Sequence, residues 1–349
     1  MARSIAGIDI GNGSIRAAEI VRRNRSKPLL VRYSEVPLPE GAVSRGEVKE
    51  PNTVAAALKT LWQQGGFKTK DVVLGIGNHR VISRDFSLRK LPADQLRDVL
   101  AFEARDVLPI AVVDAVLDFY PIAEYQGDQG PMLSGLLIAA EKDMVLGNVR
   151  SVERAGLNAL DVDLVPFALS RALLGAEAPG TAAVVDVGAE SITVVVVRDG
   201  IPQFVRIVPT GGKDVTTAVL DGLDTDPTAA EASKRDLGLS AAAGLGEDAR
   251  RAAGFIEQVV GDQLTSIRNT ISYYSGGHPG APATRILLTG GAAQLRGFPE
   301  ALAGLTGLPV LQVDPLTRVD VARSVDRARL ADGERHLAVA VGLAIGAAA

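Results

Sequence analysis

The sequence contains no cysteine among its 349 residues. This absence excludes thiol catalysis, disulfide bonds and cysteine-ligated zinc, and it is compatible with a reducing compartment. Histidine is scarce as well. His79, His278 and His336 lie far apart in the sequence and show no metal-binding spacing. The phosphate-loop pattern GxxxxGK[ST] is also missing, since Gly212-Lys213 has no upstream glycine at the required spacing. A P-loop enzyme is therefore disfavoured.

Basic residues are not in excess, and the net charge of −4 disfavours a general nucleic-acid-binding protein. The hydrophobic share of 47% and the charged share of 22% are those of a folded protein, and the length suits two domains. The N-terminus leads directly into a predicted strand, so we expect no signal peptide. The apolar segment Leu337–Ala349 is shorter than the roughly 20 residues that span a bilayer, and we expect a buried closing helix there.

One stretch near the N-terminus, IAGIDIGNGSIRAAEI, has alternating apolar residues on both sides of a short glycine-rich segment. This pattern predicts two strands joined by a hairpin. Asn12-Gly13 favours a type I′ turn, in which both central residues have positive φ. The N–H groups at such a tip can form an anion nest, and Asp9, Ser14 and Arg16 would complete a cradle for a metal-bound phosphate. A solvent-exposed hairpin with a polar tip is the simpler alternative.

Residues 183–198, AVVDVGAESITVVVVR, repeat this pattern. The alignment without a gap pairs three positions: Asp9 with Asp186, Gly11 with Gly188, and Ser14 with Ser191. A repeat of this kind predicts two related halves that face each other across a cleft. A third strand, ILLTGG, ends in Gly290 and Gly291 and completes the set.

The order of predicted elements suggests a domain organisation. Residues 1–80 and 156–180 form the first half, with a loop over Pro37–Glu50. Residues 81–155 form an α+β insert with strands near 81–88, 116–122 and 132–140 and helices near 94–107 and 142–155. The second half takes residues 181–223 and 251–349, and the polar, alanine-rich residues 224–250 form a small outer subdomain.

The two hairpins and the segment ILLTGGAAQLRGFPEAL resemble the phosphate and adenosine motifs of the superfamily of actin, sugar-kinase and heat-shock-chaperone ATPases. The position of the insert resembles the cell-division family FtsA. The segments FEARDVLPI, LVPFALSRALL, DVGAESITV and AEASKRDLG resemble the type IV pilus assembly family PilM. The resemblance implies an α/β actin-like ATPase fold, with two ribonuclease-H-like halves around a nucleotide cleft and an FtsA-type insert.

The resemblance also implies the roles of single residues. Asp9 and Asp186 would hold Mg²⁺ through water. The remaining predicted ATP-binding residues are Gly11, Asn12, Gly13, Ser14, Gly188 and Ser191 at the β- and γ-phosphates, Gly211 and Gly212 near the phosphates, Glu231 and Lys234 at ribose and adenine, and Gly290 and Gly291 beside the adenosine. A plain strand-to-helix turn at Gly211-Gly212 and a solvated helix face at Glu231 and Lys234 are the alternatives.

Two features depart from the superfamily pattern. Arg16 stands where many relatives carry a lysine, and a planar guanidinium does not replace a point charge. Glu190 places negative charge in the second phosphate motif unless it points away. No residue is singled out to activate water, although Glu141, Asp163 and Asp186 are candidates, so ATP binding is better supported than rapid hydrolysis.

The resemblance to the PilM family implies a partner, the cytoplasmic N-terminal tail of a PilN-like inner-membrane protein in the pilus assembly complex. We expect helix Asp94–Val107 and strand Val116–Ile122 of the insert to flank its groove, with Leu96 and Leu100 as possible groove residues. The chain would then be cytoplasmic and peripheral to the inner membrane, with self-association possible. The alternatives are an FtsA-like filament protein with a membrane tether and a sugar-kinase-type phosphotransferase.

Overall fold

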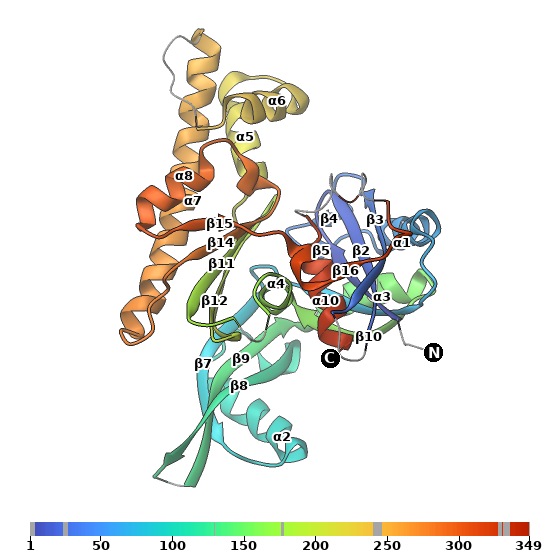
Figure 1. Cartoon of the computed structure of the whole chain (residues 1–349), viewed down its shortest axis with the longest axis vertical. Coiled ribbons are helices and arrows are strands. Elements are labelled where there is room, and N and C mark those ends of the chain that lie inside the picture. Colours follow the sequence, from blue (N-terminus) through green and yellow to red (C-terminus); the bar gives the residue numbers. More distant parts are fainter. Residues whose placement is uncertain are drawn as a thin grey trace.

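The computed structural model describes residues 4–23, 27–128, 130–175, 178–239, 246–326, 330 and 336–348. Two large sheets, each with its own helices, form the body of the molecule, and a third, smaller sheet projects from one end (Figure 1). The helices of the described part are each too short or too polar to cross a bilayer.

The first sheet has the strand order β10-β6-β1-β2-β3-β16. Its strands are β1 (Ser4–Ile10), β2 (Ser14–Val21), β3 (Leu29–Pro37), β6 (Asp71–Ile76), β10 (Asn158–Leu164) and β16 (Asp320–Val321). Helices α1 (Pro51–Gly65) and α3 (Lys142–Arg154) pack against it. Alternate residues of β1 belong to different cores, since Ala6 and Ile8 pack with α1 whereas Ile5 packs in the core between the halves.

The second sheet repeats this plan with the order β13-β12-β11-β14-β15. Its strands are β11 (Thr181–Val187), β12 (Ile192–Arg198), β13 (Ile201–Val208), β14 (Ile286–Thr289) and β15 (Val310–Gln312). Its helices are α5 (Gly212–Leu223), α6 (Pro227–Leu237), α7 (Glu247–Gly277) and α8 (Phe298–Thr306). In both sheets a meander of three antiparallel strands continues into parallel strands, which confirms the predicted repeat.

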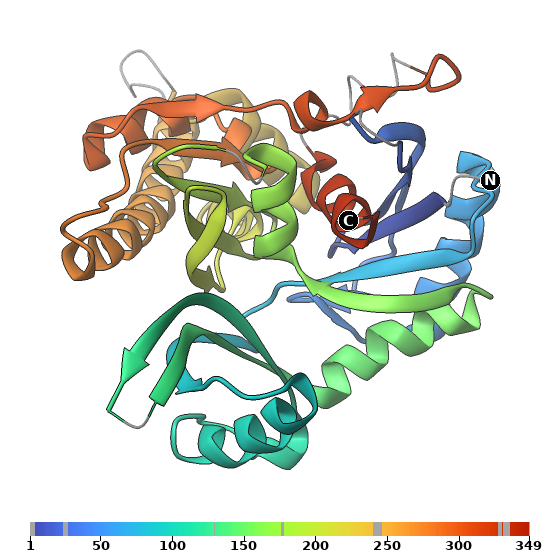
Figure 2. The same ribbon diagram turned by 60° about the horizontal axis from the view of Figure 1, so that its bottom comes forward.

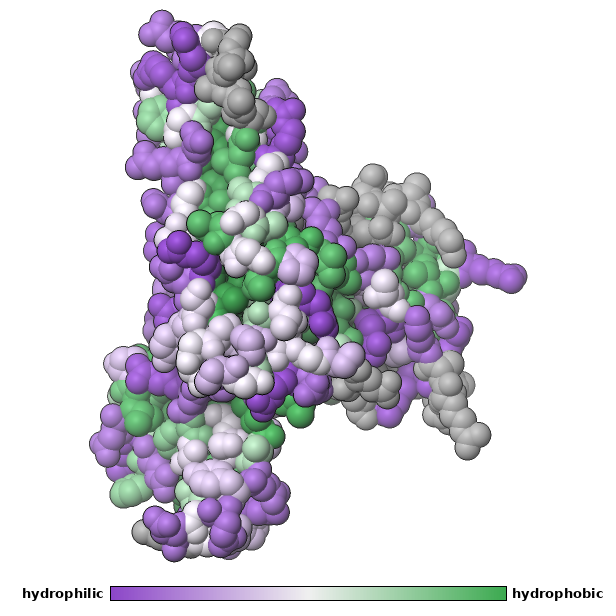
Figure 3. All heavy atoms as spheres, turned by 60° about the vertical axis from the view of Figure 1, so that its left-hand side comes forward, coloured by the Kyte–Doolittle hydropathy of each residue, from purple (hydrophilic) through white to green (hydrophobic). Residues whose placement is uncertain are grey.

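The valine run of β12 is buried on both sides. Val195 and Val197 pack in the core that contains α4 (Val165–Leu173), whereas Val194 and Val196 pack in the core that contains α7. A strand covered on both faces needs apolar residues at every position, which explains the continuous run. Figure 3 shows that hydrophilic residues cover much of the arm that carries α6 and α7.

The last helix, α10 (Ala338–Ala348), lies beside α4 in the middle of the molecule (Figure 2). It packs against α4, β1 and β2 of the first half. A Cβ atom on Gly7 would lie 2.1 Å from Ala340 O, and one on Gly342 would lie 1.9 Å from Ala168 O, so both crossings require glycine. The burial of α10 agrees with the predicted closing helix.

Two predicted domain boundaries differ from the structure. Residues 251–349 were assigned to the second half, but β16 pairs with β3 and α10 covers β1, so the final segment returns to the first half. The insert was expected over residues 81–155, but α3 packs on α1 and β10 of the first half. The insert sheet therefore spans residues 81–141, because its third strand ends at Glu141.

The insert consists of β7 (Val81–Arg89), α2 (Ala93–Glu103), β8 (Ala115–Gly127) and β9 (Gly130–Glu141), with strand order β7-β9-β8. Leu100 is buried in its core, and Leu96 packs against the same core. Buried Leu100 is therefore not a groove residue, whereas the possible groove role of partly buried Leu96 stays a prediction. Helix periodicity identified an apolar face but did not distinguish a core from a binding surface.

Short elements complete the chain. The predicted loop Pro37–Glu50 contains a two-stranded ribbon, β4 (Val43–Ser44) and β5 (Glu47–Val48). Single turns of 3₁₀ helix occupy Ala104–Asp106, Val112–Asp114, Ala292–Gln294 and Pro315–Arg318. The ribbon was missed because each of its strands has only two residues, too few to show a period.

Candidate functional site

A cleft of about 910 Å³ lies between the two halves. Fourteen of the predicted residues line it: Asp9, Gly11, Asn12, Gly13, Ser14, Arg16, Asp186, Gly188, Ser191, Gly212, Glu231, Lys234, Gly290 and Gly291. Gly211 is not among the lining residues. Positions separated by almost the whole chain thus meet in one place, while their roles in binding remain predictions.

The tips of the two hairpins are closed by equivalent backbone hydrogen bonds. Gly11 N–H donates to Ser14 O at 3.0 Å, and Gly188 N–H donates to Ser191 O at 2.9 Å. The predicted type I′ turn at Asn12-Gly13 is wrong, because neither residue has positive φ. Contacts from outside the hairpin hold this tip instead, since Asn12 Oδ1 accepts from Gly46 N–H and Gly13 O accepts from Leu38 N–H.

A charge network surrounds the first hairpin. Arg16 lies opposite Asp9 across the hairpin and opposite Glu35 on β3. Its guanidinium is 3.3 Å from Asp9 Oδ2 and 2.9 Å from Glu35 Oε1. Ser14 Oγ also donates to Glu35 Oε1 at 2.6 Å, and Tyr33 donates to Glu35 Oε2 at 3.1 Å. Arg16 is thus fixed between two carboxylates.

Sequence reasoning missed Glu35. Burial opposes ionisation of its carboxyl group, but Arg16 and the hydrogen bonds from Ser14 and Tyr33 outweigh burial and lower its pKa. The register of β2 against β3, which pairs Glu35 with Arg16, was the available signal, because opposite charges across a ladder stabilise each other.

The surroundings of Asp186 in the second hairpin differ from those of Asp9. Thr193, not a basic residue, lies opposite Asp186 across the hairpin. Burial, together with the charge of Asp9, raises the pKa of Asp186 to about 7 against the opposing effect of Arg16. Burial also raises the pKa of Asp9, although Arg16 counteracts it. The single positive charge of Arg16 therefore does not balance the carboxylates of Asp9 and Asp186.

This donor set fits a divalent cation. Two partly buried carboxylates that repel each other offer hard oxygen ligands, which Mg²⁺ prefers. Among the described residues, no group of three or more histidine, aspartate or glutamate side chains could hold a metal by itself. A Mg²⁺ ion here would take its other ligands from water and phosphate, as is usual for this ion.

Glu231 and Lys234 lie on α6 at another part of the cleft. Lys234 Nζ is 2.5 Å from Glu231 Oε2, 2.8 Å from Thr216 Oγ1 and 3.1 Å from Gly212 O. Thr216 donates to Glu231 at 2.6 Å. The pair is thus anchored to the start of α5 rather than to solvent alone. The Glu231 carboxylate still lines the cleft and can accept hydrogen bonds from a ligand.

Gly211 and Gly212 bring the start of α5 against the second hairpin. Gly212 N–H donates to Gly188 O at 3.0 Å, and a Cβ atom on Gly211 would lie 2.5 Å from the same oxygen. Buried Gln263 of α7 donates to Gly211 O at 2.9 Å and to Thr210 Oγ1 at 3.0 Å. Gln263 was missed because one polar residue on an apolar helix face carries no local motif.

The geometry invites comparison with known proteins. The sequence matches the family model of the type IV pilus assembly protein PilM over residues 7–348. The chain belongs to the PilM family. It is similar to a solved structure titled "PilM-PilN type IV pilus biogenesis complex", with 26% identity, coverage of 99% of this chain and 98% of that chain, and a TM-score of 0.85.

Other relatives agree on the fold. FtsA of Bacillus subtilis (strain 168) is 24% identical over 226 residues, which cover 58% of this chain and 51% of FtsA. The chain spans about half the length of the curated relatives it matches. A structure of MreB 5 of Spiroplasma citri bound to AMPPNP is 12% identical, with 99% of this chain and 96% of that chain covered and a TM-score of 0.54. The actin-like ATPase fold is thereby confirmed.

The three water-activating candidates of this PilM-family chain have different surroundings. Asp186 lines the cleft, whereas Glu141 forms an ion pair with Arg80 and Asp163 forms one with Arg171. Neither Glu141 nor Asp163 is among the residues that line the cleft. His336, which sequence reasoning did not select, lines it beside Gly291.

Glu190 lines the cleft of this PilM-family chain, and its charge is compensated. Its Oε1 atom accepts from Lys213 Nζ at 3.0 Å, and its Oε2 atom accepts from Arg45 N–H at 2.6 Å. Lys213 is on the same half, but Arg45 belongs to the first half. Glu190 therefore joins the two sides of the cleft.

Proposed function

We propose that this chain binds ATP with Mg²⁺ in the cleft and acts as a nucleotide-responsive scaffold of type IV pilus assembly. The observation that carries the proposal is the convergence of two equivalent hairpins, with Asp9 and Asp186, on one cleft. The match to a structure of MreB 5 bound to AMPPNP supports a nucleotide of this class.

Calorimetry and thermal unfolding with Mg-ATP test this proposal. Saturating Mg-ATP should raise the melting temperature, and chelation of the metal should abolish the effect. A ligand at one hundred times its Kd stabilises the folded state by about 2.7 kcal/mol. An unchanged melting temperature together with no heat of binding would refute nucleotide binding.

We expect slow hydrolysis. Glu141 and Asp163 are engaged in ion pairs, and neither is placed to orient a water molecule beside a terminal phosphate. Positioning of the water is as necessary as charge neutralisation in phosphoryl transfer. Turnover by the purified protein should stay well below the enzyme median of about 10 s⁻¹. A faster rate without a partner would contradict this expectation.

We also propose that the insert docks the N-terminal cytoplasmic segment of a PilN-like membrane protein, which would hold the chain at the inner face of the membrane. The related structure titled as a PilM-PilN complex supports this partner. On the insert, Phe102 of α2 is 68% exposed and Val116 of β8 is 43% exposed. In the described part β8 pairs only with β9, so its other edge offers main-chain hydrogen bonds to an extended peptide.

The test uses a labelled synthetic peptide with the N-terminal residues of the PilN-like protein of the same organism. Phe102→Asp and Val116→Asp should weaken its binding in fluorescence polarisation. Leu311→Asp is the matched control, because Leu311 is 48% exposed on β15 of the second half. Equal loss in the control, or no loss in either insert variant, would argue against docking on this surface.

The FtsA-like tail anchor finds little support in the last helix. Residues Ala338–Ala344 are all buried against α4 and the first sheet, with Gly342 packed on the backbone of Ala168. A helix that packs into a core on several sides is not free to lie on a lipid surface. A tether through the partner would allow membrane association without exposing α10.

A further inference from the structure

The ribbon β4–β5 reaches the cleft through a tight turn. Arg45 and Gly46 both have positive φ, of 50° and 71°. A type I′ turn requires this conformation, and it is unfavourable for arginine. Gly46 is also tightly enclosed, since a Cβ atom there would lie 2.9 Å from Asn78 Cβ. The surrounding contacts therefore hold the turn in one conformation.

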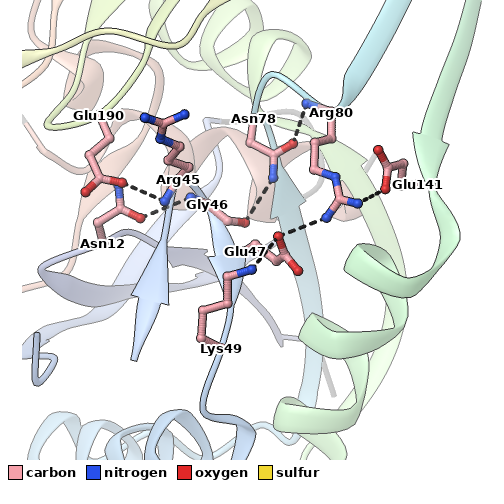
Figure 4. Close-up of polar contacts among 9 residues, drawn as sticks. All are labelled: Asn12, Arg45, Gly46, Glu47, Lys49, Asn78, Arg80, Glu141 and Glu190. Carbon is pink, nitrogen blue, oxygen red and sulfur yellow. Dashed lines mark hydrogen bonds and ion pairs between the residues drawn. The ribbon is translucent and has the colours of Figure 1, made fainter. Parts of the chain in front are cut away.

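On one side, the turn contacts both phosphate hairpins. Gly46 N–H donates to Asn12 Oδ1 at 3.0 Å in the first hairpin. Arg45 N–H donates to Glu190 Oε2 at 2.6 Å in the second hairpin (Figure 4). Asn12 and Glu190 occupy the two loops where the phosphates are expected. A movement of one half relative to the other would therefore change at least one of these two hydrogen bonds.

On the other side, the ribbon contacts the base of the insert. Gly46 O accepts from Asn78 Nδ2 at 3.3 Å, and Asn78 Oδ1 accepts from Arg80 N–H at 3.0 Å. The Asn78 side chain is buried, with 3% exposure. The Arg80 guanidinium is 2.9 Å from Glu47 of the ribbon and forms an ion pair with Glu141 (Figure 4).

Arg80 and Glu141 mark the two points where the chain enters and leaves the insert. Arg80 precedes β7, and Glu141 is the last residue of β9. The next residues inward, Val81 and Ala140, are register partners, so the two crossings lie side by side. The chain therefore enters and leaves the insert at one place, and the ion pairs of Arg80 join that place to the ribbon.

We propose that the ribbon, residues 43–48, couples the cleft to the insert, so that nucleotide binding between the hairpins changes the position of the insert strands relative to the first half. This inference rests on the proposed nucleotide site. The polar chain Asn12–Gly46–Asn78–Arg80–Glu141 carries the coupling from the first hairpin, and Glu190–Arg45 adds the second hairpin. By linkage, a partner bound to the insert changes the affinity for the nucleotide by the same factor.

Hydrogen–deuterium exchange of the full-length protein with and without Mg-ATP tests the coupling. Mg-ATP should change exchange both at the hairpin tips and in the insert strands β7 and β9. In Arg80→Gln, the change at the hairpin tips should persist, while the change in the insert should fall by about fivefold or more, the low end of typical coupling factors. Arg80 is not among the cleft-lining residues, so Mg-ATP binding itself should be retained.

Lys49→Gln is the matched control. Lys49 Nζ also contacts Glu47, at 2.9 Å, but it is half exposed and, among the ion pairs of the described residues, it makes none with Glu141 at the end of the insert. This variant should behave as wild type. Arg80→Gln could lower the melting temperature enough to unfold the insert before nucleotide is added. In that case Glu141→Gln replaces it, because this variant removes the ion pair between Arg80 and Glu141 and keeps the one between Arg80 and Glu47.

The outcomes separate the two proposals. Mg-ATP binding with no change in the insert of the wild type would overturn the coupling and leave the nucleotide site standing. A full insert response in both Arg80→Gln and Glu141→Gln would do the same. An absence of Mg-ATP binding by calorimetry would overturn both proposals.

Discussion

The two hairpins have the same backbone but opposite electrostatic surroundings. Both close through an N–H to carbonyl bond over four residues, and both present an aspartate at the same position. In the first hairpin the cross-strand partner of Asp9 is Arg16, whereas in the second hairpin the partner of Asp186 is Thr193. The Asp9 carboxylate therefore has a cation opposite it on the neighbouring strand, and the Asp186 carboxylate has none there.

This difference shows which parts of the cleft are preorganised. Arg16, held by Glu35, has a fixed direction before any ligand arrives. Asp186 is left with a raised pKa, because burial and Asp9 both disfavour its charge. A site built in this way gains most from a cation that arrives with the ligand, and variants of the two hairpins can test that asymmetry.

The largest expected effect is on nucleotide binding. Asp9→Ala and Asp186→Ala should each abolish the stabilisation by Mg-ATP, about 2.7 kcal/mol at one hundred times the wild-type Kd. Thermal unfolding with and without Mg-ATP measures this loss. Asp221→Asn, an exposed change on α5, is the control and should respond like wild type. A normal Mg-ATP response in either alanine variant would remove that aspartate from the site.

Arg16→Thr makes the first hairpin resemble the second. Asp9 and Glu35 lose their shared cation, and the unfolding free energy of the nucleotide-free protein should fall by about 2 kcal/mol near pH 7.5, as for a hydrogen bond to a charged group. Urea unfolding measures the change. The deficit should shrink below about pH 4, as the pH falls through the lowered pKa of Glu35 and this carboxylate takes up a proton. A stability equal to wild type at pH 7.5 would mean that the network contributes nothing.

The pH dependence of the metal-free protein reports on Asp186. Its pKa of about 7 in the folded state lies above the ordinary value of about 3.9, so the folded state binds the proton more tightly. The resulting stabilisation is complete below pH 4 and is lost as the pH rises through 7. Asp186→Asn lacks this loss, so its melting temperature should exceed that of wild type by about 2 °C or more at pH 8.

The control for this experiment is the same pair of proteins at pH 5, where the difference should be smaller. Both proteins are measured with a chelator, so that no bound metal masks the charge. A difference that does not grow between pH 5 and pH 8 would show that the Asp186 carboxyl group has an ordinary pKa.

The smallest effect is expected at Lys213. Its ion pair with Glu190 raises the pKa of Lys213, but the lysine side chain is 54% exposed. Exposed ion pairs contribute little, so Lys213→Gln should change the unfolding free energy by less than about 1 kcal/mol. Urea unfolding beside Arg16→Thr gives the comparison directly. A loss as large as that of Arg16→Thr would place the stronger electrostatic anchor in the second hairpin.

Local patterns predicted most of the fold. The apolar alternation of the hairpins and their repeat were sufficient to place both sheets, and the repeat also brought Asp9 and Asp186 together. Pairings between segments far apart in the sequence were not predicted. The pairing of β16 with β3 joins residues about three hundred positions apart, and no local period encodes it.

The same division holds for the site. Residues within motifs, such as Ser14 and Lys234, were found because glycines and charges mark them. Glu35 and Gln263 were missed because their importance comes from the register of a neighbouring strand and from a helix that crosses behind the site. The turn at Asn12 was misjudged because tertiary hydrogen bonds override the preference of the dipeptide.

The position of α10 has a consequence for biosynthesis. Strand β1 leaves the ribosome about three hundred residues before helix α10, yet α10 covers one face of β1, with Gly7 packed against Ala340. The first half therefore stays unfinished until α10 has been made. Contacts of such long sequence separation slow folding, and the exposed apolar face of the nascent chain is a natural target for chaperones.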